Sequence, residues 1–266
     1  MITVRSLHVY PVKSCRGISL ASAVVVPTGF RFDRQWMVVS PDGGFLSQRS
    51  NPVLARVSTR IDSELLILDA RGRTCLEIAA GEPDGDERSV TIWNDRCGAV
   101  SAGPEAAEWF SSLLGTPCEL VRQPDAGVRQ VDGRFADPSD RVAFADGFPF
   151  LLISQASVDE LGRRLGEPVP ADRFRANIIV SGCEPHAEDH WNEITIGKLG
   201  FQIAKPCARC VVITTDQKNG ARSAEPLRTL AGYRTVDGKV LFGQNLVHRG
   251  PGKLRVGDQV HTRHLS

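Results

Sequence analysis

The sequence predicts a mainly β protein with a few helices. Short apolar runs recur along most of the 266 residues, and many alternate apolar with polar residues or are rich in Val and Ile, as strands are. The 25 glycines and 16 prolines separate these runs at short intervals. The chain is long enough for one large β domain or two smaller ones.

The N-terminal half is expected to be rich in sheet and to contain one helix. The apolar runs there are residues 3–10, 23–26, 35–39, 57–61, 65–68 and 90–93. A helix is predicted for residues 105–114, because Pro104 opens this segment and Gly115 closes it, the usual order of these residues at helix ends.

A polar segment separates the two halves. Residues 123–140 mix Arg with Asp, Gly and Pro and show no sustained period, which predicts a long surface loop. We therefore expect an N-terminal domain of residues 1–122, a linking loop of residues 123–140 and a C-terminal domain of residues 141–266.

The C-terminal half is expected to form a barrel or a sandwich with one helix. An apolar run, residues 148–153, precedes a segment in which Ser157 and Glu160 have capping-box spacing and Gly166 marks a helix end. The strand-like runs that follow are residues 178–180, 194–196, 201–203, 211–214, 240–242 and 254–256.

Charge and patterning exclude several classes of function. The net charge is +1, from 32 Lys and Arg against 31 Asp and Glu, so nothing indicates a nucleic-acid or membrane partner. The N-terminus runs directly into a strand-like pattern without a basic and apolar leader, which predicts a soluble, cytoplasmic protein. No Gly-x-Gly-x-x-Gly or Walker pattern is present, which disfavours nucleotide-binding folds.

The run Lys205-Pro206-Cys207-Ala208-Arg209-Cys210 is the most suggestive local motif. The seven cysteines form an odd and scattered set, typical of reduced thiols, and only this pair is closely spaced. The neighbouring cations favour the thiolate, which is a soft ligand for a redox metal.

Other roles remain open for this cysteine pair. A dithiol redox pair is expected near a βαβ pattern, which the surrounding sequence lacks. A structural zinc site needs four ligands, and neither a second Cys-x-x-Cys nor a His pair with ligand spacing completes one. Two ordinary cysteines on a strand are the third alternative.

Two loops carry groups that can bind an anion such as phosphate. Lys13 and Ser14 follow the first predicted strand in a loop that ends in Gly17. Ser154 stands just ahead of the predicted second helix, where free backbone N–H groups attract anions. The structural alternatives are a solvated surface loop and simple helix capping.

Two arginines stand where strands begin. Arg34 and Arg175 can each make a bidentate contact to a phosphate or form a structural ion pair, with Asp33 and Asp172 respectively. Taken alone, each residue favours the structural pair.

Together these elements resemble the MOSC family in order, type and spacing. The matching runs cover nearly the whole chain. They are Tyr-Pro-Val-Lys-Ser-Cys from Tyr10, Asp-Arg-Gln-Trp from Asp33, Pro-Phe-Leu-Leu-Ile-Ser from Pro149, Phe-Arg-Ala-Asn-Ile from Phe174, Ser-Gly-Cys-Glu from Ser181, Ala-Glu-Asp from Ala187, Cys-Ala-Arg-Cys from Cys207, Thr-Thr-Asp from Thr214, Phe-Gly-Gln from Phe242 and Val-Gly-Asp from Val256.

The resemblance implies a fold and a cofactor. The fold is a MOSC β-barrel packed with an N-terminal MOSC_N β-barrel-like domain. The cofactor is molybdenum with molybdopterin, a pyranopterin dithiolene, and Cys210 is expected to be both the metal ligand and the catalytic residue. The residues expected to bind the cofactor are Lys13, Ser14, Arg34, Ser154, Arg175, Asn177 and Cys210.

The resemblance also implies a reaction. The family includes the mitochondrial amidoxime-reducing component, so a two-electron reduction of N-hydroxylated compounds is expected. Some relatives carry a membrane anchor before the first strand or a ferredoxin-like domain after the last. This chain is expected to lack both and to receive electrons from a separate protein of the ferredoxin, cytochrome b5 or flavin reductase type. The alternative is a cofactor-binding or sulfur-carrier module without reductase activity.

Overall fold

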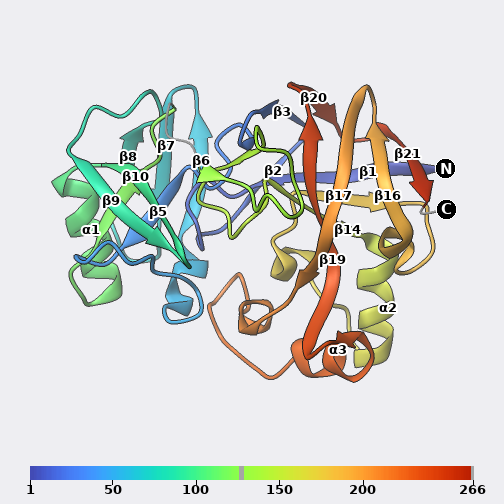
Figure 1. Ribbon diagram of the computed structural model, residues 1–266. Helices are drawn as coiled ribbons and strands as arrows, with labels where there is room; N and C mark the ends of the chain where they lie inside the picture. The colour runs from blue at the N-terminus through green and yellow to red at the C-terminus, as the bar shows by residue number, and fades with distance from the viewer. Residues whose placement is uncertain (126–128, 265–266) are drawn as a thin grey trace.

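The computed structural model describes residues 1–125 and 129–264. As predicted, the protein is mainly β: 42% of the chain is strand, accompanied by three α-helices in the described residues. The predicted fold class is therefore confirmed. Figure 1 shows two lobes, one formed by elements of the first half of the chain and the other dominated by a barrel.

The barrel has seven strands. In sheet order they are β14 (Phe150–Ser154), β15 (Ile178–Ser181), β1 (Ile2–Val9), β21 (Gln259–His264), β16 (Trp191–Ile196), β17 (Leu199–Ala208) and β19 (Lys239–Arg249). Pairing of β14 with β19 closes the ring, and only the β14–β15 pair among these is parallel. Short strands β2 (Ile18–Leu20) and β18 (Thr235–Val236) extend the sheet at β1 and β19.

The first strand of the chain lies in this barrel. β1 pairs antiparallel with both β15 and β21, and its residues Val4, Leu7 and Val9 belong to the barrel core, with a register shift between Val4 and Ser6. A three-stranded sheet of β20 (Gly252–Arg255), β3 (Ser22–Val26) and β4 (Gly29–Phe30) also joins distant parts of the chain. Residues 1–122 thus share strands with the C-terminal barrel and do not stand apart from it.

Aromatic side chains fill the barrel. Phe150 stands edge-on to Phe30 and Phe201, with ring centroids 4.9 Å and 5.4 Å apart. All three rings are almost fully buried. Burying such rings is among the largest favourable contributions to folding, so this cluster fixes the barrel to the segment that carries Phe30.

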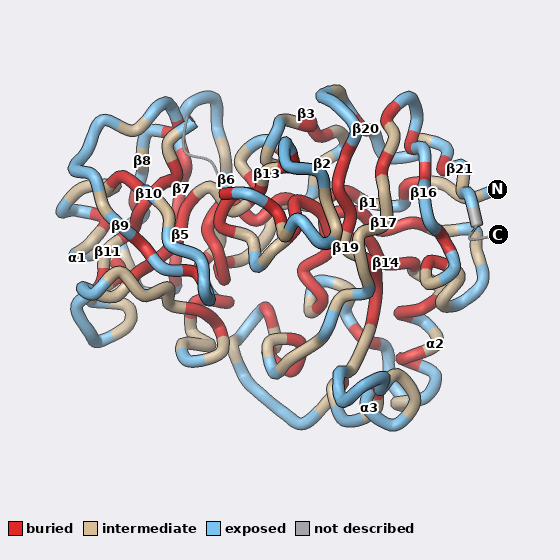
Figure 2. The backbone as a smooth tube through the Cα atoms, in the orientation of Figure 1, coloured by how far each residue is buried: buried red, intermediate tan, exposed pale blue. Residues whose placement is uncertain are grey.

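The N-terminal lobe packs two small sheets and a helix. One sheet has the order β5 (Trp36–Val39), β11 (Glu119–Arg122), β10 (Asp95–Ser101) and β9 (Glu87–Ile92), and the other has β6 (Ser58–Asp62), β7 (Leu65–Asp69) and β8 (Leu76–Ala79). Trp36, Leu68 and Phe110 form part of the core between them. Figure 2 shows buried backbone inside each lobe and exposed backbone along the connecting loops.

The two predicted helices end where the sequence predicts, but each begins earlier than predicted. α1 (Pro104–Leu114) is capped by Gly115 in the left-handed conformation, as expected from the Pro and Gly positions. α2 (Gln155–Leu165) begins earlier than predicted, because Ser154 is its N-cap in place of Ser157. α3 (Leu227–Arg234) was not predicted, and Figure 1 shows it beside α2 at one end of the barrel.

Two predicted segments differ in the structure. Residues 211–214, expected to be a strand, form a 3₁₀ turn, η4 (Val211–Thr214), in which the hydroxyl of Thr214 donates to the carbonyl of Val211 over 2.8 Å. A run of four β-branched residues is too short for its periodicity to distinguish a strand from a 3₁₀ turn. The expected loop at residues 123–140 contains β12 (Arg129–Gln130), which pairs with β13 (Arg141–Val142), while residues 126–128 lie outside the described part.

Among the described residues, no helix combines the length and apolarity needed to cross a membrane.

Candidate functional site

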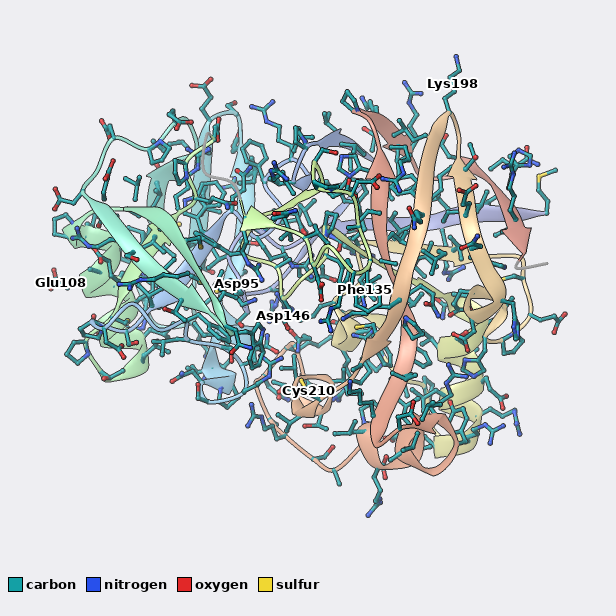
Figure 3. All side chains as sticks on the ribbon, in the orientation of Figure 1. Asp95, Glu108, Phe135, Asp146, Lys198 and Cys210 are labelled. Atoms are coloured by element: carbon teal, nitrogen blue, oxygen red, sulfur yellow. The ribbon has the colours of Figure 1, made fainter. Side chains whose placement is uncertain are left out.

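A cleft between the two lobes gathers most of the predicted binding residues. Lys13, Ser14 and Arg34 line it from the N-terminal part of the chain, and Arg175, Asn177 and Cys210 line it from the C-terminal part. Figure 3 shows Asp146 and Cys210 near one another in the region where the lobes meet. Residues more than 100 positions apart in sequence therefore share one site.

The two cysteines enter this cleft from the end of β17. The register of β17 against β19 shifts between Pro206 and Ala208, and Cys210 then caps the 3₁₀ turn η4 in an extended conformation. Both thiols are free. Burial raises the pKa of Cys207, although Arg209 works against this, so Cys207 is protonated at neutral pH. A protonated thiol is a poor metal ligand, so burial disfavours Cys207 in that role.

Arg175 brings a buried, incompletely paired cation to the cleft. Its Nη1 donates to the carbonyl of Cys15 over 2.6 Å, but its Nη2 is buried without a hydrogen-bond partner among the described residues. Burial lowers the pKa of Arg175 to about 10, and the nearby charge of Arg34 acts in the same direction. The guanidinium is still charged at neutral pH, so the cleft offers a cation to an anion.

Arg209 is a second incompletely paired cation in the cleft. Its Nε donates to the carbonyl of Phe242 over 2.9 Å and its Nη1 to that of Phe174 over 3.2 Å. Its Nη2 is also buried and has no partner within residues 1–125 and 129–264. A buried donor without an acceptor destabilises a fold by about 1–3 kcal/mol. The donors of Arg175 and Arg209 that are unpaired among the described residues, both on one cleft, therefore indicate a site for an anionic ligand.

Arg34 and Asn177 are held mainly by the protein itself. Nη1 of Arg34 contacts Asp33 over 2.6 Å and the side-chain oxygen of Asn177 over 3.0 Å, and its Nη2 donates to the carbonyl of Arg175 over 2.9 Å. The amide of Asn177 also accepts from Leu151 N and donates to the carbonyl of His8. The structural pair of Arg34 with Asp33 is therefore present. Arg34 and Asn177 form part of the wall of the cleft.

Lys13 is paired with a carboxylate that the sequence interpretation missed. Its Nζ donates to Asp146 over 2.5 Å and to the carbonyl of Phe144 over 2.8 Å. Arg49 contacts the same carboxylate over 3.2 Å. Desolvation opposes ionisation of Asp146, but the charges of Lys13 and Arg49 prevail and hold its pKa below the ordinary value. The cleft therefore contains both signs of charge.

Ser154 does not line this cleft. It is fully buried, and its hydroxyl accepts the N–H of Ser157 as the N-cap of α2. Its own N–H donates to the carboxylate of Glu188 over 3.0 Å, and the hydroxyl of Ser157 donates to the same oxygen over 2.8 Å. An internal carboxylate thus occupies the N-terminus of α2, and the structural alternative of helix capping describes Ser154.

Several cleft residues were not singled out from the sequence. They are Arg49, Asp146, Phe148, Arg173, Arg209 and Asn245. Arg209 stands between the two cysteines of the motif, where the sequence alone indicates only a charge that favours the thiolate. The others come from separate loops and strands that only folding brings together.

Comparison with known proteins places the chain in a family. Residues 1–117 match the MOSC N-terminal beta barrel domain, and residues 139–261 match the MOSC domain. The mitochondrial amidoxime-reducing component 1 of Mus musculus is 35% identical over 278 residues, which cover 97% of this chain and 82% of that protein. The counterpart in Homo sapiens has the same identity and coverage. A molybdenum cofactor sulfurase of Oryza sativa is 34% identical over 91% of this chain but only 32% of its own length. The chain therefore belongs to the MOSC family, with the N-terminal domain that accompanies it.

Proposed function

We propose that this chain binds molybdopterin with molybdenum in the cleft and reduces N-hydroxylated compounds with electrons from a separate redox protein. The observation that carries the proposal is a single cleft in which the free thiol of Cys210 lies with the guanidinium groups of Arg175 and Arg209. Each of these guanidinium groups keeps a buried nitrogen without a partner among the described residues. The named relatives include amidoxime-reducing components, which supports the same activity.

The residues fit the proposed cofactor chemically. A phosphorylated pterin carries an anion that can accept hydrogen bonds from Nη2 of Arg175 and of Arg209. The hydroxyl of Ser14 accepts the N–H of Gln48, and its proton can be donated to the same ligand. The thiolate of Cys210 would be the protein's ligand to the metal, since a soft thiolate suits a redox metal.

When bound, the cofactor supplies the two-electron redox chemistry. The N–OH group of the substrate takes up two electrons and two protons, its N–O bond breaks, and an N–H group and water are formed. The protein orients the partners: Phe148 offers an apolar wall, and Asn245, held by its side-chain N–H to the carbonyl of Lys205, lines the same cleft. The electrons come from a ferredoxin, a cytochrome b5 or a flavin reductase.

The alternative function is a cofactor-binding or sulfur-carrier module. The similarity to a molybdenum cofactor sulfurase favours it, since this chain matches one part of that longer protein. A carrier holds the cofactor or a persulfide without turning over an N-hydroxylated substrate. A cytoplasmic location is also a proposal.

A reductase assay tests the proposal. The chain is produced in a host that makes the cofactor, supplied with a chemically reduced viologen dye and benzamidoxime, and benzamidine is measured. We expect turnover with the native chain and with Cys75→Ser, a control at an exposed thiol, and loss of turnover with Cys210→Ser. A cofactor-loaded chain that reduces neither an amidoxime, a hydroxylamine nor an N-hydroxylated base analogue would contradict the reductase and favour the carrier.

A further inference from the structure

A second pocket, of about 350 Å³, lies apart from the cleft. It is formed by the turn between β3 and β4, the segment between β4 and β5, the end of β8 and the end of β11, and it shares no lining residue with the cleft. The cleft and the second pocket lie on either side of one short segment, since Arg34 lines the cleft and the next residue, Gln35, lines the second pocket. A pocket of this volume is large enough for a small organic ligand.

A buried arginine lines this second pocket. The side chain of Arg122 is only 5% exposed, and within residues 1–125 and 129–264 its single carboxylate contact is from Nη2 to Asp125, at 3.3 Å. Its Nε and Nη1 are buried and have no partner among the residues that the structure describes. Burial lowers the pKa of Arg122, and Asp125 and Glu82 oppose that shift. Arginine starts from so high a value that the group is charged at neutral pH.

Two amides beside Arg122 are also incompletely paired. Nε2 of Gln123 and Oε1 of Gln35 are buried without a partner in the described part of the chain, and Gln123 is only 4% exposed. Their backbones are paired to each other, since Gln123 N donates to Gln35 O over 2.9 Å. More than nine in ten buried polar groups in native proteins are hydrogen-bonded. The pocket therefore presents donors from Arg122 and Gln123 and one acceptor from Gln35 that match a ligand with both kinds of group.

Charges at the pocket decide what kind of ligand fits. Arg31 and Arg122 are balanced by Glu82 and Asp125, so the lining is neutral as a whole. Glu82 is exposed, and the side chain of Asp125 is 66% exposed, which places these carboxylates toward solvent and the guanidinium of Arg122 toward the interior. Carboxylates at the mouth repel a phosphate or any other polyanion and attract an ammonium group.

Most of the remaining lining residues are apolar. The apolar ones are Val26, Pro27, Phe32, Ala80 and Pro124, and Thr28 and Gly81 complete the lining. An apolar wall beside a buried cation and an outer pair of carboxylates suits a molecule with a carboxylate, an ammonium group and a hydrocarbon side chain.

We propose that this second pocket binds a free α-amino acid with an apolar side chain, whose carboxylate meets Arg122 and Gln123 and whose ammonium group meets Gln35, Glu82 and Asp125. The proposal is independent of the proposed reductase function, because none of these residues lines the cleft.

Isothermal titration calorimetry of the full chain tests the ligand class. The probes are glycine, L-valine, L-leucine and L-phenylalanine, together with 4-methylpentanoate and L-leucinamide, which lack the amino group and the carboxylate of leucine respectively. We expect binding of at least one apolar amino acid and affinities at least about tenfold weaker for both leucine analogues, since each loses one charge-assisted contact. No binding of any probe, as when water alone occupies the pocket, would overturn the proposal, and so would equal binding of leucine and both analogues.

Two substitutions locate the binding. Gln123→Met removes a buried amide that has no partner among the described residues, so it is expected to leave the fold intact and to weaken amino-acid binding about tenfold. The matched control is Gln130→Met, at an exposed glutamine on β12. Arg122→Met is expected to abolish measurable binding, with the exposed Arg71→Met as its control. Native affinity in a folded Gln123→Met variant would overturn the assignment to this pocket, even if Arg122→Met fails to fold.

Discussion

The guanidinium of Arg34 donates to the side-chain oxygen of Asn177 over 3.0 Å and so joins residues 143 positions apart on the two sides of the cleft. The same guanidinium holds Asp33, whose side chain is only 2% exposed and whose other oxygen accepts the N–H of Tyr10. One side chain thus ties the first loops of the chain to the segment that enters β15. The wall of the cleft is part of what holds the lobes together.

Replacing Arg34 should therefore destabilise the fold. In Arg34→Met the carboxylate of Asp33 is left buried without its cation, which costs about 3–5 kcal/mol in comparable pairs. Urea unfolding of the cofactor-free chain measures the loss. The matched control is Arg60→Met, since the Arg60–Asp62 pair is exposed at both partners and its loss should change the free energy of unfolding by less than about 1 kcal/mol. Equal stability of the two variants would contradict the role given to Arg34.

Ser154 should matter for stability and not for the cofactor. Its hydroxyl caps α2, so Ser154→Ala is expected to lower the free energy of unfolding by about 1 kcal/mol. Molybdenum content should stay at the native level, because Ser154 is buried away from the cleft. Metal analysis and thermal unfolding of the same preparation separate the two effects. A variant of native stability that no longer retains molybdenum would return Ser154 to the cofactor site.

Arg209 should act on the cofactor more than on the fold. Lysine keeps the positive charge but cannot reproduce the planar set of donors, so Arg209→Lys is expected to retain the pterin about tenfold less tightly. The readout is the pterin that remains after extensive dialysis. Arg163→Lys, on the exposed face of α2, serves as the control. Unchanged retention in Arg209→Lys would mean that this guanidinium does not hold the anion.

Stability should fall in alkaline solution through Cys15. Burial raises the pKa of Cys15 to about 12 from the ordinary value of 9.0, so the native state holds a proton that the unfolded state releases first. The resulting stability is complete below pH 9 and is lost as the pH rises toward 12, by about 1.4 kcal/mol per pH unit. In Cys15→Ala the slope of the unfolding free energy between pH 9 and 11 should be shallower by one proton. An unchanged slope would assign the alkaline loss to other groups, such as Tyr10, whose pKa burial also raises to about 12.

Much of the fold followed from periodicity and punctuation. The apolar residues Val4, Leu7 and Val9 among exposed or half-buried ones were sufficient to predict β1, and Pro104 with Gly115 predicted the end of α1 and its start to within one residue. The strand predicted for residues 211–214 was wrong, because a short β-branched run fits a strand and a 3₁₀ turn equally well. The place of β1 in the C-terminal barrel could not be predicted, since strand pairing depends on contacts far apart in sequence.

The site was predicted by residue type more than by contact. The resemblance and the placement of cations selected Lys13, Arg34 and Arg175, and the fold brings them to one cleft. Ser154 lies outside the cleft lining, and the internal carboxylate of Glu188 that its N–H contacts cannot be recognised as its partner from 34 residues away. Asp146 was missed for the same reason, since its pairing with Lys13 spans 133 positions.

The most direct test of the central proposal is the molybdenum and pterin content of the chain purified from a host that makes the cofactor, compared with Cys210→Ala and Cys207→Ala. The proposed site predicts that molybdenum and pterin co-purify with the native chain and with Cys207→Ala, and that Cys210→Ala loses the metal while it stays folded. A native chain without either component, under conditions that load a control molybdoenzyme, or full molybdenum content in Cys210→Ala, would contradict the assignment of this cleft and its thiolate.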